Sequence, residues 1–396
     1  MAEEERSPGS AVGAAGSSAS GAVWRVREAL RAWRRAHPDV PGSGVCVGLS
    51  GGADSLALTA AAVAEFGPEL GAGSVRALVV DHGLQTGSAD IARSAAAAAR
   101  SLGAEALVLT ADVRGPGGPE AAARAARYSA LDAARGDRPV LLAHTLDDQA
   151  ETVLLGLARG SGARSLRGMS PWAAPWGRPL LGIRRADTRA ACAGAGVVAW
   201  DDPHNLDPRF RRVRVRSELL PLAEDVLGPG FAEALARTAG LLGEDEDALS
   251  ALATDLLESA RVPEVGGRES GGTEDGARDE PLEPREPGAP GGTALAVDPL
   301  AAAPAAVRGR AIKAWLEAEG AGAPTSAHIG AVSALVTSWN GQGAVAVPAG
   351  AGGGDIRRHP EGGGGGVAGG ARPGSRAVRR LVVQREGRVL RLRIRQ

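Results

Sequence analysis

Ser50-Gly-Gly-Ala-Asp-Ser55 follows the apolar run Val45–Leu49 and leads into a stretch that is rich in Ala and Leu. The run before it predicts a buried strand, and the residues after it predict a helix. Two glycines let backbone amides approach an anion closely, and the start of a helix adds partial positive charge. The pattern therefore predicts a loop that cradles phosphate, although the lysine of a Walker A loop is missing.

Asp54 is the unusual member of this loop, because a carboxylate repels phosphate. Its presence makes sense if Mg²⁺ bridges it to phosphate oxygens, or if it orients the loop. The simpler alternative is a glycine-rich turn that only caps a helix. The residues that we expect to contact phosphate are Ser50, Gly51, Gly52, Ala53, Asp54 and Ser55.

Working outward from the loop, short apolar runs alternate with Ala-rich helical stretches as far as residue 200. The runs are Val45–Leu49, Val75–Val80, Ala106–Leu109, Val140–Ala143 and Val197–Trp200. Strands that alternate with helices are typical of βαβ units, which build a parallel sheet covered on both faces. We therefore expect an α/β fold for this part of the chain.

Composition divides the chain further. We expect a disordered tail over residues 1–20, because it is rich in Ser, Gly and Ala and has no apolar periodicity. The α/β catalytic domain then spans 21–222, and a helical domain spans 223–345. Within the helical domain, residues 261–294 have almost no large apolar side chain, which predicts a flexible insertion. Residues 346–396 comprise a Gly-rich linker and a small basic β region, whose Arg/Leu/Val alternation around Glu386-Gly387 predicts two strands.

Charge and composition exclude several classes of protein. The formal net charge is −1, but the basic stretches 160–220 and 355–396 are offset by the acidic insertion. This distribution is compatible with a nucleic-acid partner. No apolar run is long enough to span a membrane, and the acidic start is unlike a signal peptide, so we expect a cytoplasmic protein. The two cysteines, Cys46 and Cys192, form no CxxC motif.

Polar residues follow two further strands at the edge where open α/β sheets bind ligands. Asp81 and His82 come after the second run, and a cluster comes after the fourth. The cluster consists of His144, Asp147, Asp148 and Glu151. Two acids at a helix start also suit the helix dipole alone. Four polar residues in an apolar neighbourhood favour a site for a cation, either Mg²⁺ or the ammonium group of a substrate.

Six further motifs, in order, carry a resemblance to a known family. They are Val80-Asp-His-Gly-Leu84, Glu120-Ala-Ala-Ala-Arg-Ala-Ala-Arg-Tyr128, Ala143-His-Thr-Leu-Asp-Asp-Gln-Ala-Glu-Thr152, Arg159-Gly-Ser-Gly162, Arg178-Pro-Leu-Leu181 and Asp202-Pro-His-Asn-Leu-Asp207. With the loop, which looks like the PP-loop of N-type ATP pyrophosphatases, they resemble the tRNA(Ile)-lysidine synthetase family over roughly residues 44–222. The resemblance implies a PP-loop ATPase fold.

The resemblance also implies roles for single residues. Asp81 and His82 would join the loop in binding ATP, Asp54, Arg124, Asp147 and Asp148 would be catalytic, and Asp54 and Asp148 would hold Mg²⁺. His144, Glu151, Arg212, Arg214 and Arg216 would contact lysine or tRNA. The alternative for Arg124 is a surface ion pair with Glu120 and no role in the site. The chain departs from the family pattern at Val213, where Asn is usual, and at Gln85, where Arg is common.

The resemblance implies a reaction in two steps. ATP adenylylates the C2 oxygen of the wobble cytidine of a tRNA(Ile) with a CAU anticodon, and the ε-amine of free L-lysine then displaces AMP. ATP and Mg²⁺ would be the cofactors, and a homodimer is one candidate assembly. Two alternatives remain: another PP-loop tRNA-modifying or amidotransferase-type enzyme, or a tRNA-binding protein with a decayed ATP site. The missing CxxC motif speaks against the first, and the retained Asp54, Asp147 and Asp148 speak against the second.

Overall fold

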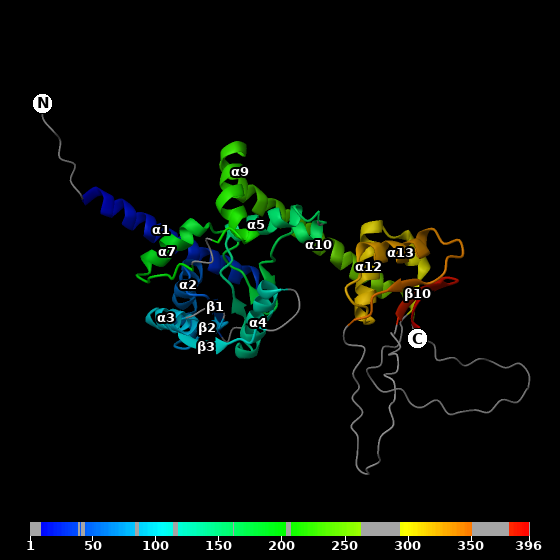
Figure 1. Cartoon of the computed structure of the whole chain (residues 1–396), viewed down its shortest axis with the longest axis horizontal. Coiled ribbons are helices and arrows are strands. Elements are labelled where there is room, and N and C mark those ends of the chain that lie inside the picture. Colours follow the sequence, from blue (N-terminus) through cyan, green and yellow to red (C-terminus); the bar gives the residue numbers. More distant parts are fainter. Residues whose placement is uncertain are drawn as a thin grey trace, which may run out of the picture. The chain divides into compact units, whose positions relative to one another are not determined.

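The computed structural model describes residues 9–395, except 39, 41–43, 84–86, 114–117, 161, 203–206, 263–293 and 351–379. The chain divides into two compact units, Met1–Glu244 and Asp245–Gln396. The division falls inside the long helix α10 (Phe231–Ala260). Both units are drawn in Figure 1.

A six-stranded sheet forms the centre of the N-terminal unit, in the order β3-β2-β1-β4-β6-β5. The strands are β1 (Val45–Leu49), β2 (Val75–Asp81), β3 (Glu105–Thr110), β4 (Val140–Leu141), β5 (Trp172–Ala173) and β6 (Trp176–Gly177). All neighbours pair in parallel except β5 and β6, which are antiparallel. The predicted α/β fold with a parallel sheet is confirmed.

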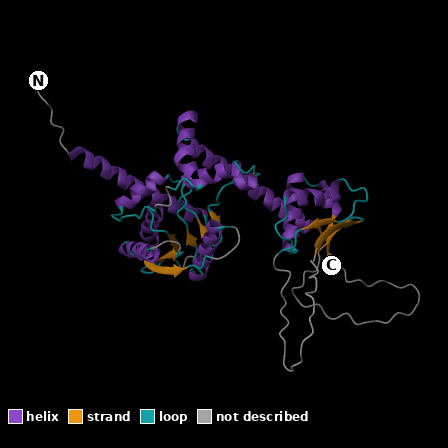
Figure 2. Ribbon diagram, in the orientation of Figure 1, coloured by secondary structure: helices purple, strands orange, loops and turns teal. Residues whose placement is uncertain are grey.

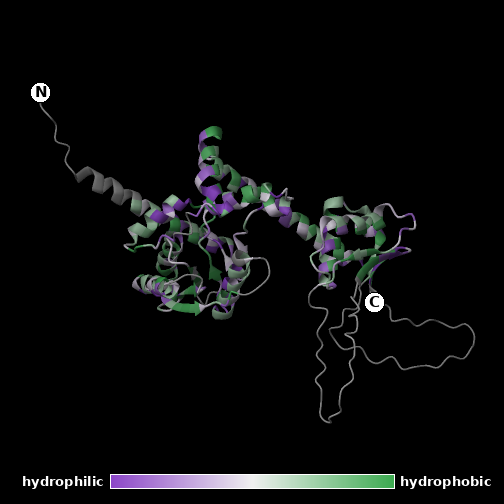
Figure 3. Cartoon of the chain, in the orientation of Figure 1, coloured by the Kyte–Doolittle hydropathy of each residue, from purple (hydrophilic) through white to green (hydrophobic). Residues whose placement is uncertain are grey.

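Helices lie on both faces of this sheet (Figure 2). They are α1 (Gly9–Ala36), α2 (Ala53–Leu70), α3 (Ser88–Ser101), α4 (Pro119–Ala134), α5 (Leu146–Leu157), α6 (Ala163–Leu166) and α7 (Arg185–Gly194). The chain then continues through α8 (Arg211–Arg214), the π-helix η2 (Val215–Leu219) and α9 (Leu220–Leu227) into α10. All five residues of β1 are buried, as a strand covered on both faces requires. Figure 3 shows the hydrophobic strands at the centre of the unit.

Two expectations for this unit are corrected. Helix α1 begins at Gly9, within the segment that we expect to be a disordered tail; its Ala content favours a helix, and residues 1–8 lie outside the described part. Val197–Trp200 forms no strand. Instead, the Trp200 N–H donates to the Gly51 carbonyl at 3.0 Å, so this segment fastens the phosphate loop rather than extending the sheet.

The C-terminal unit has a five-stranded sheet in the order β7-β8-β11-β10-β9. Its strands are β7 (Arg261–Val262), β8 (Ala294–Ala296), β9 (Val345–Val347), β10 (Arg380–Glu386) and β11 (Val389–Arg395). The helices are α11 (Val297–Ala302), α12 (Ala305–Ala318) and α13 (Ser326–Thr337). The predicted pair of strands around Glu386-Gly387 is confirmed as β10 and β11, which are antiparallel.

Helices and strands of this unit share one core. Trp315 of α12, Val383 of β10 and Leu390 of β11 are all fully buried within it. Composition predicts a helical domain, 223–345, that is separate from a β region, 346–396. The structure packs parts of both together, because each covers the apolar face of the other. The Gly-rich linker and nearly all of the expected insertion 261–294 lie outside the described residues.

Candidate active site

The phosphate loop connects β1 to α2 and is held by its own side chains. The Ser55 hydroxyl donates to the Gly52 carbonyl at 2.9 Å and accepts from the Ser50 N–H at 3.2 Å. Gly51 has φ +83°, a conformation that glycine adopts without strain. No described side chain caps the start of α2 at Gly52. The first amides of the helix are therefore available to an anion, as a phosphate site needs.

Asp54 lies in the first turn of α2, and only 25% of its side chain is exposed. One carboxylate oxygen accepts from the Thr188 hydroxyl, and the other lies 3.4 Å from Nε of Arg185. Burial raises the pKa of Asp54, and these two donors only partly oppose that effect. A carboxylate with a raised pKa is a suitable proton acceptor in a reaction that releases a proton.

Asp81 and His82 lie at the carboxyl end of β2. The Asp81 carboxylate accepts the Gly83 N–H at 3.0 Å, and this backbone hydrogen bond lowers the pKa of Asp81. Nδ1 of His82 is buried and has no hydrogen-bond partner among the described residues. Burial, together with the positive charge of Arg127, lowers the pKa of His82.

Helix α5 begins with a capping box that uses one of the predicted site residues. The Asp148 Oδ2 atom accepts the Thr145 N–H at 2.8 Å, and Thr145 accepts the Asp148 N–H in return. This leaves Oδ1 of Asp148 to meet Nη2 of Arg185 at 2.7 Å. Burial raises the pKa of Asp148, but Arg185 and the Thr145 amide outweigh it and hold the pKa below its ordinary value. His144, just before the cap, has a buried Nδ1 with no partner in the described part of the chain, and burial lowers its pKa to about 3.

Glu151 lies one turn further along α5 and is fully buried. Arg212 contacts it at 2.8 Å and Arg216 at 2.6 Å. These arginines are four residues apart and face the same side, as residues of that spacing do in a helix. Arg214 lies on another side and pairs with Glu218 at 2.9 Å. The structure therefore does not bring it to the acid cluster, which consists of Asp54, Asp147, Asp148 and Glu151. Val213 contributes no polar group there.

Arg185 is a site residue that none of the sequence motifs singles out. As the first residue of α7, it donates its backbone N–H to Asp147 at 2.7 Å. The preceding Arg184 also contacts Asp147, at 3.5 Å. Two arginines at a helix start oppose the helix dipole, and this unfavourable placement is the signal in the sequence that acids lie nearby. Burial lowers the pKa of Arg185, but the surrounding carboxylates outweigh this effect and raise the pKa well above its usual range.

Arg124 is not brought to the acid cluster. It is exposed on α4, with its guanidinium stacked 4.9 Å from the Tyr128 ring centroid and Nη2 3.2 Å from the Tyr128 hydroxyl. The side chain of Glu120, its alternative partner, lies outside the described residues. Arg124 and Arg127 instead place positive charge near His144, where both lower the histidine pKa, after burial and Arg178.

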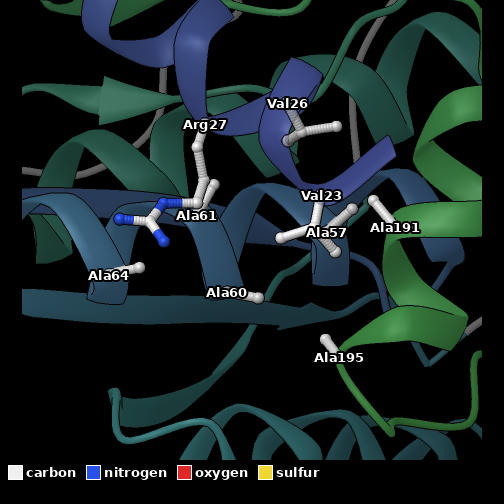
Figure 4. A pocket seen from close by; sticks show the side chains of 9 residues that line it. All are labelled: Val23, Val26, Arg27, Ala57, Ala60, Ala61, Ala64, Ala191 and Ala195. Carbon is white, nitrogen blue, oxygen red and sulfur yellow. The ribbon is translucent and has the colours of Figure 1, made fainter. Parts of the chain in front are cut away.

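An apolar hollow elsewhere in the unit carries no candidate chemistry. It lies where α1, α2 and α7 pack together (Figure 4). Its lining is mostly small and apolar: Val23, Val26, Arg27, Ala57, Ala60, Ala61, Ala64, Ala191 and Ala195. Arg27, its charged member, is already paired with Glu65 at 2.6 Å. The hollow therefore reflects packing between Ala-rich helices, and the site remains at the carboxyl edge of the sheet.

Comparisons with known proteins identify the family of this chain. Residues 27–223 match the model of the PP-loop domain family, and residues 295–361 match the TilS substrate binding domain. The chain is 54% identical over 326 residues to a tRNA(Ile)-lysidine synthase of Nocardia farcinica, covering 82% of this chain and 92% of that protein. It is 51% identical over 331 residues to that of Mycobacterium tuberculosis, covering 82% and 91%.

The solved structures that are similar include a U34-tRNA thiolase from Methanococcus maripaludis. Its TM-score is 0.46 at 17% sequence identity, over 57% of this chain and 80% of that chain. A likeness at that level adds nothing to the assignment.

The loop, the parallel sheet and the matched domain define the N-terminal unit as a PP-loop ATP-using domain. The chain belongs to the tRNA(Ile)-lysidine synthase family. The expected family, fold class and use of ATP are thereby confirmed. The roles of single site residues stay predictions. Among the described residues, no helix is long and apolar enough to cross a membrane.

Proposed function

We propose that this chain ligates free L-lysine to C2 of the wobble cytidine of a tRNA(Ile) with a CAU anticodon, at the expense of ATP. In the first step, the C2 oxygen attacks the α-phosphorus of ATP and pyrophosphate leaves. In the second step, the lysine ε-nitrogen attacks C2, the bond from C2 to the esterified oxygen breaks, and AMP carries that oxygen away. Esterification is needed because a pyrimidine carbonyl oxygen is otherwise a poor leaving group.

The observation that carries this proposal is the meeting of Asp54, from the phosphate loop, with Asp148 and Glu151 from α5. Arg185 lies within 3.5 Å of all three carboxylates. The loop supplies amides for phosphate oxygens, and a carboxylate must hold or deprotonate the incoming ammonium group beside them. Asp54 is the best placed acceptor, since its side chain is more exposed than that of Asp148 (25% against 13%) and its pKa is raised by burial.

The carboxylates suit Mg²⁺ only if the phosphates of ATP supply most of its ligands. No group of three or more His, Cys, Asp or Glu in the described residues is arranged for a metal. The oxygens of Asp54 and Asp148 already accept from side-chain donors. Mg²⁺ bound to nucleotide phosphates usually takes only one or two protein carboxylates. Asp54 is the more exposed candidate, a role that it would hold while pyrophosphate leaves and not while it accepts a proton. When bound, Mg²⁺ would offset charge on the phosphates as pyrophosphate leaves.

The tRNA would be held in part by the C-terminal unit, which contains the matched substrate-binding domain. Arg391 and Arg393 of β11 are 38% and 56% exposed, and both pair with Glu386. Their guanidinium groups are suited to phosphate contacts in place of that pairing. Arg214, which is 62% exposed, offers another such group in the N-terminal unit. The homodimer, the domain limits and the cytoplasmic location stay predictions.

The test is incubation of the full chain with ATP, labelled lysine and tRNA(Ile). We expect label in the tRNA and release of one AMP for each lysine attached. Asp54→Asn should reduce both by about 100-fold or more, because the amide retains a hydrogen bond to Thr188 but accepts no proton. Asp201→Asn is the matched control, since Asp201 is 79% exposed and pairs with the exposed Arg189. Label in protein or in free nucleotide alone would contradict the proposal.

A further inference from the structure

Arg185 contacts every acid of the cluster. Its guanidinium lies 2.7 Å from Asp148, 3.4 Å from Asp54 and 3.5 Å from Glu151, measured between nitrogen and carboxylate oxygen. Its backbone N–H donates to Asp147 at 2.7 Å. The side chain is only 19% exposed. A single residue of α7 therefore joins the phosphate loop to the start of α5.

The backbone around Arg185 is itself fixed to α5. The Leu146 N–H, in the first turn of α5, donates to the Ile183 carbonyl at 2.9 Å. Leu180, a few residues earlier, is fully buried and anchors this connection in the core. One turn after Arg185, the Thr188 hydroxyl contacts Asp54. Residues three apart share a helix face, so α7 presents two donors to the loop carboxylate.

Arginine is suited to this place for a geometric reason. Its planar guanidinium has five N–H donors in a fixed fork, so one side chain can meet several carboxylates at once. The ammonium group of lysine is a compact point charge on a flexible stem and cannot fix three acceptors in one plane. Without a guanidinium here, Asp54 and Asp148 would repel each other and move apart.

We propose that Arg185 is a positioning residue for lysine transfer, which holds Asp54 of the phosphate loop in a fixed relation to Asp148 and Glu151 of α5. This inference rests on the proposed function. Arg185 acts through the carboxylates and not on the substrates, so its replacement should disturb the alignment of the reacting groups more than the binding of either substrate. A misplacement of reacting groups by about 1 Å can cost about 100-fold in rate.

The test compares Arg185→Ala and Arg185→Lys with Arg189→Ala. Arg189 lies one turn further along α7, is 61% exposed and is the matched control. We expect kcat for AMP release to fall about 10- to 100-fold in both Arg185 variants, with KM for ATP and for lysine little changed, because alignment and not binding is lost. Guanidinium or methylguanidinium ions should restore part of the activity of Arg185→Ala and leave that of Arg189→Ala unchanged. ATP affinity, measured by equilibrium binding, should stay near that of the unchanged protein.

Circular dichroism and thermal unfolding establish whether each variant is folded. If Arg185→Ala does not fold, Arg185→Lys carries the test because it retains the charge. Unchanged kcat in a folded Arg185 variant would overturn the inference. So would a lower KM for lysine with unchanged kcat, because Arg185 would then only compete with the substrate ammonium group. If the unchanged protein attaches no lysine to tRNA, the proposed function fails instead.

Discussion

Arg216 of η2 donates two hydrogen bonds to the carboxylate of Glu151 in α5. Its Nε lies 2.6 Å from one oxygen, and its Nη2 lies 3.1 Å from the other. Such a bidentate pair is among the strongest interactions that an arginine makes with a carboxylate. It fastens a helix beyond the α/β sheet to the helix that carries the acid cluster. The site thus depends on residues more than sixty positions apart being held by buried charge.

Replacing Glu151 by Gln should therefore destabilise the N-terminal unit. The change leaves Arg212 and Arg216 without their shared counter-charge, and we expect the unfolding free energy to fall by about 2 kcal/mol. This loss of unfolding free energy is smaller than that for breaking a fully buried ion pair, because the side chains of Arg212 and Arg216 are 39% and 30% exposed. Urea unfolding measures the change. Glu218→Gln, which breaks the exposed pair with Arg214, is the control and should leave the midpoint unchanged; equal destabilisation in both variants would contradict this account.

His144 should make the folded chain sensitive to acid. Burial holds its pKa at about 3 in the folded state, against 6.5 ordinarily. Below pH 6.5 the unfolded chain takes up a proton that the folded chain refuses, so stability falls as the pH drops towards 3. At pH 5.5 the unfolding free energy should be about 1.4 kcal/mol lower than at a pH where His144 is neutral in both states. His144→Asn should remove this part of the pH dependence. NMR of the imidazole nitrogens should show His144 neutral at pH 5; a protonated ring at that pH would refute the prediction.

Gly51 and Gly52 allow a matched test of the loop conformation. Gly51 has φ +83°, and a Cβ there would lie 3.1 Å from the Ala95 Cβ, whereas Gly52 has φ −75° and its nearest such neighbour is 3.6 Å away. Gly51→Ala should cost about 1–2 kcal/mol of unfolding free energy, because L-residues are strained at positive φ. Gly52→Ala should cost less, about 0.5 kcal/mol, because its φ suits any residue but Ala is a poorer N-cap than Gly. Thermal unfolding compares the two, and equal midpoints would rule out a strained position at Gly51.

The sequence predicts the elements around the loop well. Strand β1 has the predicted bounds, since a short apolar run between turn residues leaves little choice. The hairpin of β5 and β6 escapes prediction because each strand has only two residues. Val197–Trp200 has strand-like composition, yet its backbone bonds to Gly51 instead. None of its four residues is buried, and Val198 is 92% exposed, so β-branched composition alone does not establish that a segment belongs to a sheet.

Some residues of the site can likewise be predicted from the sequence, and others cannot. Asp54, Asp148 and Glu151 follow from motifs next to strands, and the structure brings them together around Arg185. Arg185 itself lies in a short helix whose pattern names no partner, and its role depends on contacts across more than thirty positions. The separation of Arg214 from Arg212 and Arg216 follows from helical spacing alone, because residues two apart face different sides.

The C-terminal strands should bind tRNA through charge. Deleting residues 350–396 is a poor test, because it removes β10 and β11, whose Val383 and Leu390 are fully buried in the core. Replacing both Arg391 and Arg393 by Ala preserves that core. We expect weaker tRNA binding and a salt dependence whose slope is reduced by about one unit for each phosphate that the variant no longer neutralises, with ATP binding unchanged. Filter binding over a salt series measures the tRNA affinity and its salt dependence. Unchanged tRNA affinity would show that these strands do not contact the tRNA.

The most direct test of the central claim is the nucleoside composition of tRNA(Ile) after incubation with the full chain, ATP and lysine. Nuclease digestion and mass spectrometry should find the wobble cytidine converted to a nucleoside heavier by one lysine residue, with its attachment at C2. The same tRNA with uridine at that position should remain unmodified. An unmodified wobble cytidine under conditions in which the chain consumes ATP, or lysine attached elsewhere in the tRNA, would contradict the account.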